Sequence, residues 1–532
     1  MGNLTACPGS AFAVSLASAS KIASRSQTRV ILLAPTVRYD GSRCVQAHPL
    51  ERVLSLCSTD ESYGHSKITT IYMLPDNVLL DLFDHYRFFH DPYLAVWQWH
   101  LLAHVCRRWR QIIYDSPRRL DLQILCVNET PVRKNLSIWP LLPIALDYRF
   151  IQKPTRQVDK DDVIAALEHP DRVCYVRLRG LPSQLIKVAM MMQKPFPALK
   201  SLIIHGVSLG VNASLSADFL GGSAPSLRKI SLQSISFPAL PTLLSSTSDL
   251  VTLNLCRIPI TGYISPEAMA TCLAALPRLK TFLLDFQPVT SLPSQINTPP
   301  ITRSVLPVLT YFDFKGSSKY LEALVVRIDG PKLSLIAITY NDQDGVPQIV
   351  QLSKFIDRSG GPKPALSMHA RLTIFSHMVS FCLYSHPSSE YISARTVIFN
   401  EKIGWDSTRV VHFLGQISSA SNVVHLKIEL GEGHRLGDAR DIEWESLLPI
   451  FSTVRTLHVS WNLSRRIALE LEVIAEGMFA EPLPSFDLIY FEHQPTPSIP
   501  NFVTARQVSG RPVTIIDTEA EFDERLKSYV SK

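Results

Sequence analysis

A six-residue pattern with apolar side chains at its first, fourth and sixth positions recurs along most of the chain. The first seven copies start 23 to 30 residues apart. All ten copies begin at Val173, Leu199, Leu227, Leu250, Leu279, Leu309, Leu333, Val423, Val454 and Phe486. Because the last two apolar positions are two residues apart, each copy predicts a β-strand that buries one of its faces.

The segments between these predicted strands suit helices, as residues 266–276 illustrate with the sequence PEAMATCLAAL. A period of about 20 to 29 residues is typical of leucine-rich repeats, which stack into a solenoid with a curved parallel sheet. We therefore expect an α/β fold in which an irregular leucine-rich-repeat-like solenoid forms most of the chain. An ordinary α/β domain with a few similar strands is the alternative, because the spacing is unequal.

Two features make the predicted array irregular. The asparagine that usually occupies the ninth position of such repeats is replaced by Val207, Ile235 and Ile258, and it occurs only as Asn341. The turns must therefore satisfy their backbone groups by other means. Residues 340–420 are poorly patterned, and the pattern resumes after them.

Side chains that alternate with the buried ones would line the concave face, where solenoid proteins commonly bind partners. This predicted target-binding set comprises Tyr175, Arg177, Arg179, His205, Lys229, Gln233, Asn254, Asp285, Tyr311, Asp313, Lys315, His425, Lys427, Glu429, His458 and Tyr490. Its mixture of charges and aromatic rings fits a protein or peptide better than a phosphate backbone. For any single residue, the alternative is a solvated position on the sheet.

The segment before the repeats predicts two amphipathic helices. The first, in LPDNVLLDLFDHY, places four apolar residues on one face, namely Leu74, Val78, Leu82 and Phe83. Pro75 suits its first turn, where a missing N–H is harmless. In WHLLAHVCRRWRQII, apolar residues recur at spacings of three and four, which predicts a second helix over residues 99–113.

The two ends of this segment resemble an F-box. LP stands at residues 74–75 with VLLDLF behind it, and VCRRWRQII closes the segment at residues 105–113. An aromatic-rich stretch with Trp97, Trp99 and His100 replaces the short linker of the typical motif. The wider chain, including SPRRLDLQILC and LPSFDLIYFEHQ, resembles the large F-box family of mushroom-forming (basidiomycete) fungi over most of residues 74–516.

This resemblance implies a substrate receptor of a Skp-cullin ubiquitin ligase, which is not itself an enzyme. Its small all-helical module would dock a Skp-type adaptor, and through it a cullin, while the repeats bind a target protein. By motif position, the adaptor contacts would be Leu74, Pro75, Val78, Leu79, Phe83, Val105, Cys106 and Trp109. The alternative is a non-ligase repeat scaffold in which the apolar faces of the module pack internally.

Composition and charge narrow the class of protein. Apolar residues make up 46% of the 532 positions and charged residues 19%, which supports a large folded core. No apolar run approaches the 18 or so residues of a membrane-spanning helix. The net charge of only +6 is far from the concentrated positive field that nucleic-acid binding usually requires. We therefore expect neither a membrane nor a nucleic acid as a partner.

Candidate catalytic and metal-binding motifs do not assemble into a site. His100 and His104 stand four residues apart but lack the glutamate of the zinc protease motif. GEGHRLG at residues 431–437 places its third glycine one position late for a dinucleotide loop. Asp159, Asp161 and Asp162 precede an apolar helical run and suit helix capping. We expect no catalytic residue, no metal and no cofactor.

The expected organisation has four regions. They are an N-terminal extension over residues 1–70, the F-box module over 71–116, the repeat domain over 117–516 and a charged tail over 517–532. The extension is interpreted as a disordered leader or as an upstream start joined to a chain that begins near Met73.

The compartment is predicted from cysteine usage and from the first residues. Nine scattered cysteines without a CxxC pair indicate reduced thiols, and hence the cytoplasm or nucleus. Residues 1–39 contain no acidic side chain but carry Lys21, Arg25, Arg29 and Arg38, a composition shared by mitochondrial transit peptides. A mitochondrial location is therefore the alternative.

Overall fold

The computed structural model divides into two compact units, residues 1–75 and 76–532. The structure describes residues 73–88, 102–117, 119–127, 132–138, 142–150, 157–207, 214–287, 302–340, 349–359, 368–375, 378–384, 396–401, 407–417, 422–431, 444–476, 484–492, 497–516 and 521. The expected N-terminal extension over 1–70 lies outside these residues, as does the tail apart from Glu521. Among the described residues, no helix combines the length and the apolar character needed to cross a membrane.

One sheet of sixteen strands, counted over the described residues, organises the second unit. In spatial order the strands are β1 (Ile124–Val127), β2 (Ile144–Arg149), β3 (Val173–Gly180), β4 (Ser201–Gly206), β5 (Lys229–Gln233), β6 (Thr252–Ile258), β7 (Thr281–Phe286), β9 (Tyr311–Gly316), β11 (Leu335–Tyr340), β14 (Thr396–Glu401), β13 (Met378–Tyr384), β12 (Met368–Phe375), β15 (Val423–Leu430), β16 (Thr456–Val459), β17 (Leu488–Phe491) and β18 (Thr514–Ile516). A separate parallel pair joins β8 (Ser304–Val305) to β10 (Ile328–Asp329).

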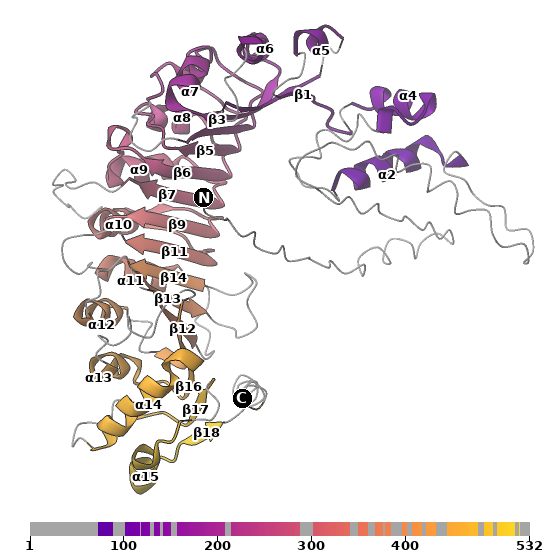
Figure 1. Ribbon diagram of the computed structural model, residues 1–532. Helices are drawn as coiled ribbons and strands as arrows, with labels where there is room; N and C mark the ends of the chain where they lie inside the picture. Colours follow the sequence, from indigo (N-terminus) through magenta and orange to yellow (C-terminus); the bar gives the residue numbers. More distant parts are fainter. Residues whose placement is uncertain are drawn as a thin grey trace, which may run out of the picture. The chain divides into compact units, whose positions relative to one another are not determined.

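Neighbouring strands of the large sheet are parallel except on the two sides of β13, where the pairs are antiparallel. The helices that alternate with the strands lie along one side of the sheet (Figure 1). From the start of the sheet they are α5 (Val132–Ile138), α6 (Gln157–Leu167), α7 (Pro182–Ala189), α8 (Leu240–Ser245), α9 (Pro266–Ala274), α10 (Ser318–Val325), α11 (Val350–Arg358), α12 (Ser407–Gly415), α13 (Trp444–Leu447), α14 (Trp461–Glu476) and α15 (Pro500–Val508). Short 3₁₀ turns stand at Phe219–Gly222, Ile260–Gly262 and Leu448–Phe451. The predicted α/β class is confirmed.

The core lies between the sheet and these helices, and the six-residue pattern supplies it. Register aligns one apolar position of each strand into a continuous row of side chains that are at most 1% exposed: Leu202, Ile230, Leu253, Phe282, Phe312 and Ile336. The rings of Phe282 and Phe312 stack with their centroids 5.5 Å apart. Each such side chain contributes about 1.5–3 kcal/mol by burial. All ten predicted strands are confirmed, and each begins at its first apolar residue or two residues after it.

Main-chain hydrogen bonds join consecutive repeats at both ends of the strands. After β4, where an asparagine would stand, the N–H of Val207 donates to the carbonyl of Gly180 at 3.1 Å. Ahead of the strands, the N–H of Lys280 donates to the carbonyl of Val251, and the N–H of Thr310 donates to the carbonyl of Lys280, both at 2.9 Å. The Thr310 hydroxyl donates to the same Lys280 carbonyl at 3.2 Å. The backbone is therefore satisfied without a side-chain ladder.

The poorly patterned region contains a β-meander. Strand β14 pairs in parallel with β11, β12 pairs in parallel with β15, and β13 runs antiparallel between them. Strands β12 to β14 lack the strand-then-helix spacing of the repeats, because among the described residues no helix stands between them. This explains why the pattern fades there while the sheet continues.

Two helices precede the sheet, α2 (Asp76–Phe88) and α4 (Arg107–Asp115). They meet through the rings of Phe83 and Trp109, whose centroids are 4.9 Å apart. The guanidinium of Arg108 also pairs with Asp76 at 2.6 Å. The first helix is as predicted, although its start is Asp76 and Pro75 stands before it.

The single second helix predicted over residues 99–113 is wrong, because the helix begins only at Arg107. Cys106 is its N-cap with extended backbone angles, and the Cys106 thiol accepts a hydrogen bond from the N–H of Trp109 at 3.4 Å. His104 lies in a turn before this cap, and His100 lies outside the described residues. The predicted i, i+4 histidine pair on one helix is therefore not formed.

Candidate functional site

The side of the sheet away from the helices, here called the open face, carries the predicted target-binding residues. Register places them in rows across the strands. Arg177 stands beside Ile203 and Ser231 stands beside Asn254, while Tyr311 and Asp313 continue the rows on β9. Most of these side chains are half-buried, whereas Arg177, His425, His458 and Tyr490 are buried. The strands thus bring the predicted set onto one surface.

Four cations surround His205 at the β3–β6 end of the open face. Burial is the largest cause that lowers the pKa of His205 to about 4, and it is followed by the charges of Arg179, Arg177, Lys229 and Arg257 in that order. The His205 Nε2 lies 3.1 Å from the Ser231 hydroxyl. A neutral imidazole therefore stands at the centre of a cationic surface near neutral pH.

A bulge in β6 adds Arg257 to this cluster. The pairing of β6 with β7 shifts register between Leu255 and Ile258, and Arg257 has a φ of +49°. Its backbone N–H donates to the carboxylate of Asp285 on the next strand. The sequence pattern did not indicate Arg257, because a regular strand would have pointed it into the core.

Acidic side chains follow on β7 and β9. Burial raises the pKa of both Asp285 and Asp313, which lie near Lys315. The Tyr311 hydroxyl donates to Asp313 at 3.1 Å, and burial together with this carboxylate raises the pKa of Tyr311 to about 12. Asn254, on β6, accepts a hydrogen bond from the Cys256 thiol at 3.0 Å.

A third cluster occupies the open face of β12 to β17. His369 stacks on His425 with ring centroids 4.4 Å apart, and His425 Nδ1 lies 2.6 Å from the Thr456 hydroxyl. Burial lowers the pKa of His425 to about 4. His369 comes from the meander, so the poor pattern concealed it.

Glu492 joins the charged groups of this third cluster. Its carboxylate lies 2.8 Å from His458 Nε2 and 3.4 Å from the ammonium of Lys427, which is also 3.4 Å from Glu429. Burial lowers the pKa of His458 to about 4 despite the adjacent Glu492. Glu492 stands one residue beyond β17, where the strand pattern gives no signal. Tyr490 belongs to a small buried cluster with Leu488 and Ile516.

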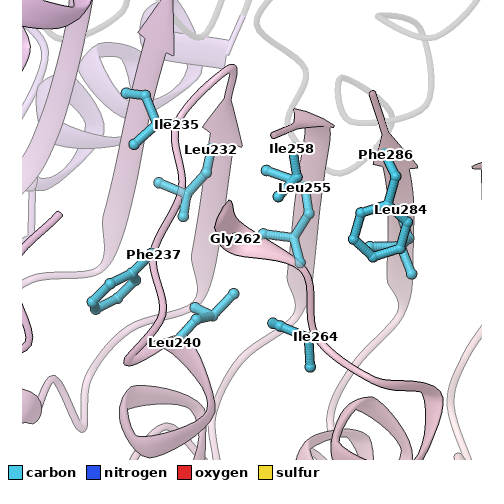
Figure 2. A pocket seen from close by; sticks show the side chains of 10 residues that line it. All are labelled: Leu232, Ile235, Phe237, Leu240, Leu255, Ile258, Gly262, Ile264, Leu284 and Phe286. Atoms are coloured by element: carbon cyan, nitrogen blue, oxygen red, sulfur yellow. The ribbon is translucent and has the colours of Figure 1, made fainter. Parts of the chain in front are cut away.

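A small pocket beneath the sheet is apolar throughout (Figure 2). It has room for roughly one water molecule. It is lined by Leu232, Ile235, Phe237, Leu240, Leu255, Ile258, Gly262, Ile264, Leu284 and Phe286. Without a polar group to orient a ligand, it is a packing defect of the core.

The predicted adaptor-binding residues divide by exposure. Pro75 is exposed, and Leu74, Val78, Val105 and Cys106 are half-buried. The remaining three, Leu79, Phe83 and Trp109, are at most 7% exposed. These buried side chains pack within the chain itself.

In the part of the chain that the structure describes, no group of three or more His, Cys, Asp or Glu is placed to hold a metal ion. Asp162 is buried on α6 and contributes to raising the pKa of Cys126 to about 12, after burial itself. Residues 432–437 of the glycine-rich loop, Asn341 and the side chain of Asp159 lie outside the described residues.

Comparisons of the chain with models of protein families and with curated proteins found no match.

Proposed function

We propose that this protein is a non-catalytic substrate receptor of a Skp-cullin ubiquitin ligase. Its helical segment, residues 74–114, would hold a Skp-type adaptor, and its leucine-rich-repeat-like array would hold a target protein. Tethering places a target lysine beside charged ubiquitin and raises its effective concentration, so this chain needs no catalytic group. The F-box-like residues at 74–75 and 105–113 support the adaptor half of the proposal.

The target-binding half is carried by one observation, the open face itself. Rows of charged, amide and aromatic side chains cross from β3 to β9 on a surface that the helices leave uncovered. Parallel strands fix the spacing of these groups, so the surface is preorganised for a partner. Large rigid surfaces of this kind suit proteins or peptides better than small molecules.

Burial within the helical segment refines the expected adaptor contacts. A side chain that is 0% exposed, such as Leu79, stabilises the helical pair and would reach a partner only if the pair opened. Val78, beside it on α2, is half-buried and needs no such change. We therefore propose Leu74, Pro75 and Val78 as direct contacts, and Phe83 with Trp109 as their support.

The proposal is tested by co-expressing the full chain with a fungal Skp-type adaptor and measuring co-purification. We expect a stoichiometric complex with the native chain and its loss with Val78→Glu, because a buried unpaired carboxylate is costly at an interface. The matched control is Val473→Glu on the exposed side of α14, which should retain the adaptor.

Circular dichroism would verify that all three proteins are folded. A folded native chain that captures no adaptor would overturn the proposal. Equal capture of the adaptor by Val78→Glu and Val473→Glu would contradict the proposal that Val78 contacts the adaptor.

The burial of Leu79, Phe83 and Trp109 favours one rival, a repeat scaffold that never meets a ligase. In that case the helical pair is internal packing, and adaptor capture separates the two functions. The six cysteines described in the structure are all free thiols, which supports our proposed placement in the cytoplasm or nucleus rather than, as the alternative, the mitochondrion.

A further inference from the structure

The open face changes its sign of charge between β6 and β7. We call Arg177, Arg179, Lys229 and Arg257 the basic segment, which lies on β3, β5 and β6. Asp285 and Asp313, on β7 and β9, form the acidic segment. Because β6 and β7 are neighbours, the two segments adjoin on one continuous surface.

Cations of the basic segment outnumber the carboxylates beside them. Arg177 pairs with Asp147 at 3.4 Å. Among the described residues, no carboxylate lies within salt-bridge distance of Arg179 or Lys229. The Nε of Arg179 is also buried without a hydrogen-bond partner in the part of the chain described. An anion bound beside these side chains would relieve the mutual repulsion of the cations.

Lys315 lies close to the acidic segment but does not fully neutralise its two carboxylates. Lys315 is the cation that most lowers the pKa of Asp285, yet burial outweighs it and the pKa stays raised. The Tyr311 hydroxyl donates a hydrogen bond to one carboxylate oxygen of Asp313 at 3.1 Å. A positive side chain from a partner would stabilise both carboxylates in their charged form.

The distances between strands determine how far apart the partner's charges must be. Neighbouring strands are about 4.8 Å apart, so the basic segment extends about 14 Å from β3 to β6. A single phosphate or carboxylate group is too small to contact cations over that distance. An extended peptide advances about 3.3 Å per residue, so about four residues cover the basic segment and about three more reach β9.

We propose that the open face binds an extended segment of a partner protein in which several acidic residues are followed, about three residues on, by a basic one. The acidic residues contact the basic segment, and the basic residue contacts Asp285 and Asp313. This inference rests on the proposed target-binding function and specifies the class of segment that is recognised. Opposite signs at the two ends fix the register and direction of the bound segment.

The test uses the full chain and two labelled peptides of identical composition. The first has four glutamates, two glycines and two lysines in that order, and the second alternates glutamate with lysine around the same glycines. Fluorescence anisotropy at low salt should show at least about tenfold tighter binding of the ordered peptide, because only it can match both segments. Raising the salt concentration should weaken that binding, since the cluster is partly exposed.

Charge reversal then locates the binding surface. Arg179→Glu should weaken the ordered peptide at least about tenfold, and Lys229→Gln should do so by a smaller factor. The matched control is Arg465→Glu on the exposed side of α14, which should leave the affinity unchanged. Lys229→Gln, which introduces no repulsion, provides the test if Arg179→Glu fails to fold.

Equal affinity for the two peptides would overturn the proposal, as would equal weakening by Arg179→Glu and Arg465→Glu. Tighter binding of a peptide with one phosphoserine and no glutamates would also overturn it, by showing that one concentrated anion is recognised. Adaptor capture is measured separately. Adaptor capture without discrimination between the peptides would overturn this inference alone. Discrimination between the peptides without adaptor capture would overturn only the ligase proposal.

Discussion

The open faces of β3–β9 and of β12–β17 arise from the same alternation of side chains, but their polar groups are satisfied in different ways. At the first, Arg179 and Lys229 face solvent without a carboxylate partner among the described residues. At the second, Lys427, His458 and Glu492 bond to one another, and His369 stacks on His425. The first surface therefore has cations that can still pair with a partner's anions. On the second surface, the polar side chains already pair with one another between strands.

Polar side chains at equivalent repeat positions therefore need not share a role. His425 and Lys427 looked as suitable for target binding as His205 and Lys229. His425 is buried and lies beside the Thr456 hydroxyl, and half-buried Lys427 pairs with Glu429 and Glu492. We therefore expect both residues to stabilise the C-terminal strands. We expect substitutions at the two surfaces to separate binding from stability.

The largest expected effect is a core truncation that distinguishes the two halves of the sheet. Phe381→Ala on β13 removes a fully buried ring that packs on Phe451 at a centroid distance of 5.9 Å. We expect the loss of about 3–5 kcal/mol in unfolding free energy. Because each repeat contacts chiefly its neighbours, amide hydrogen exchange should accelerate in β12–β18 and remain slow in β3–β9.

Phe312→Ala on β9 is the matched control, since its ring is equally buried and stacks on Phe282. It should accelerate exchange mainly in β6–β11. Uniform acceleration over all strands by either variant would mean that the sheet unfolds as one unit, and the comparison of two halves would fail.

A smaller effect is expected from pH. The folded pKa of His425 is about 4 against an ordinary value of 6.5, so below pH 6.5 the unfolded chain takes up a proton that the folded chain does not. Stability should therefore fall as pH drops from 6.5 towards 4. At pH 5 this amounts to about 2 kcal/mol from one such histidine, and His425→Gln should abolish its share in denaturant titrations.

His205 provides a comparison with His425, because its pKa is also lowered to about 4 but nearby cations contribute more to the shift. Four cations depress it beyond the effect of burial, whereas Arg455 alone is the cation that acts on His425. Added salt screens charges on the partly exposed surface. Each histidine causes a loss of unfolding free energy at low pH, and the His→Gln variant removes that loss. At high salt the loss caused by His205 should become smaller, whereas the loss caused by His425 should stay the same. Equal salt dependence would contradict the assigned causes.

The smallest effects compare one paired and one unpaired polar side chain. Glu492→Gln should cost about 1–2 kcal/mol, because it weakens bonds to His458, Lys427 and the N–H of Trp461. Arg179→Gln should change stability by less than about 0.5 kcal/mol, because no ion pair within the described residues is lost. Chemical denaturation of both variants measures the difference, and a larger cost for Arg179→Gln would reverse our assignment of the two surfaces.

Local pattern predicted the repeating strands, because each strand's buried face depends only on its own alternation. The same alternation placed Arg177, Asp313 and Lys427 on the open face. The ten predicted strands did not include β1, β2 or β18, and the pattern missed the meander, where no helix separates the strands among the described residues.

Pairings between distant residues could not be read from the chain. Glu492 reaches His458 from 34 positions away, and Arg257 joins the open face only through a register shift. Cys106 shows the same limit at short range. An amphipathic period continued through it, but its thiol caps Trp109 and ends the preceding turn. Apolar periodicity predicts which face of an element is buried, but it does not predict the residue at which a helix begins or ends.

The β-meander has a consequence for how the chain folds during synthesis. From β2 to β11, each strand of the large sheet can add to the strand of that sheet made before it, so this half can assemble as it leaves the ribosome. Strand β12 is made next but is separated from β11 in the sheet by β13 and β14. It must wait until β14 has been made before the sheet can continue from β11 to β15. The edge of β11 therefore stays unpaired until residues 396–401 have been made, which is longer than the edges of the earlier strands wait, and over this interval the nascent sheet is exposed to aggregation or to chaperones.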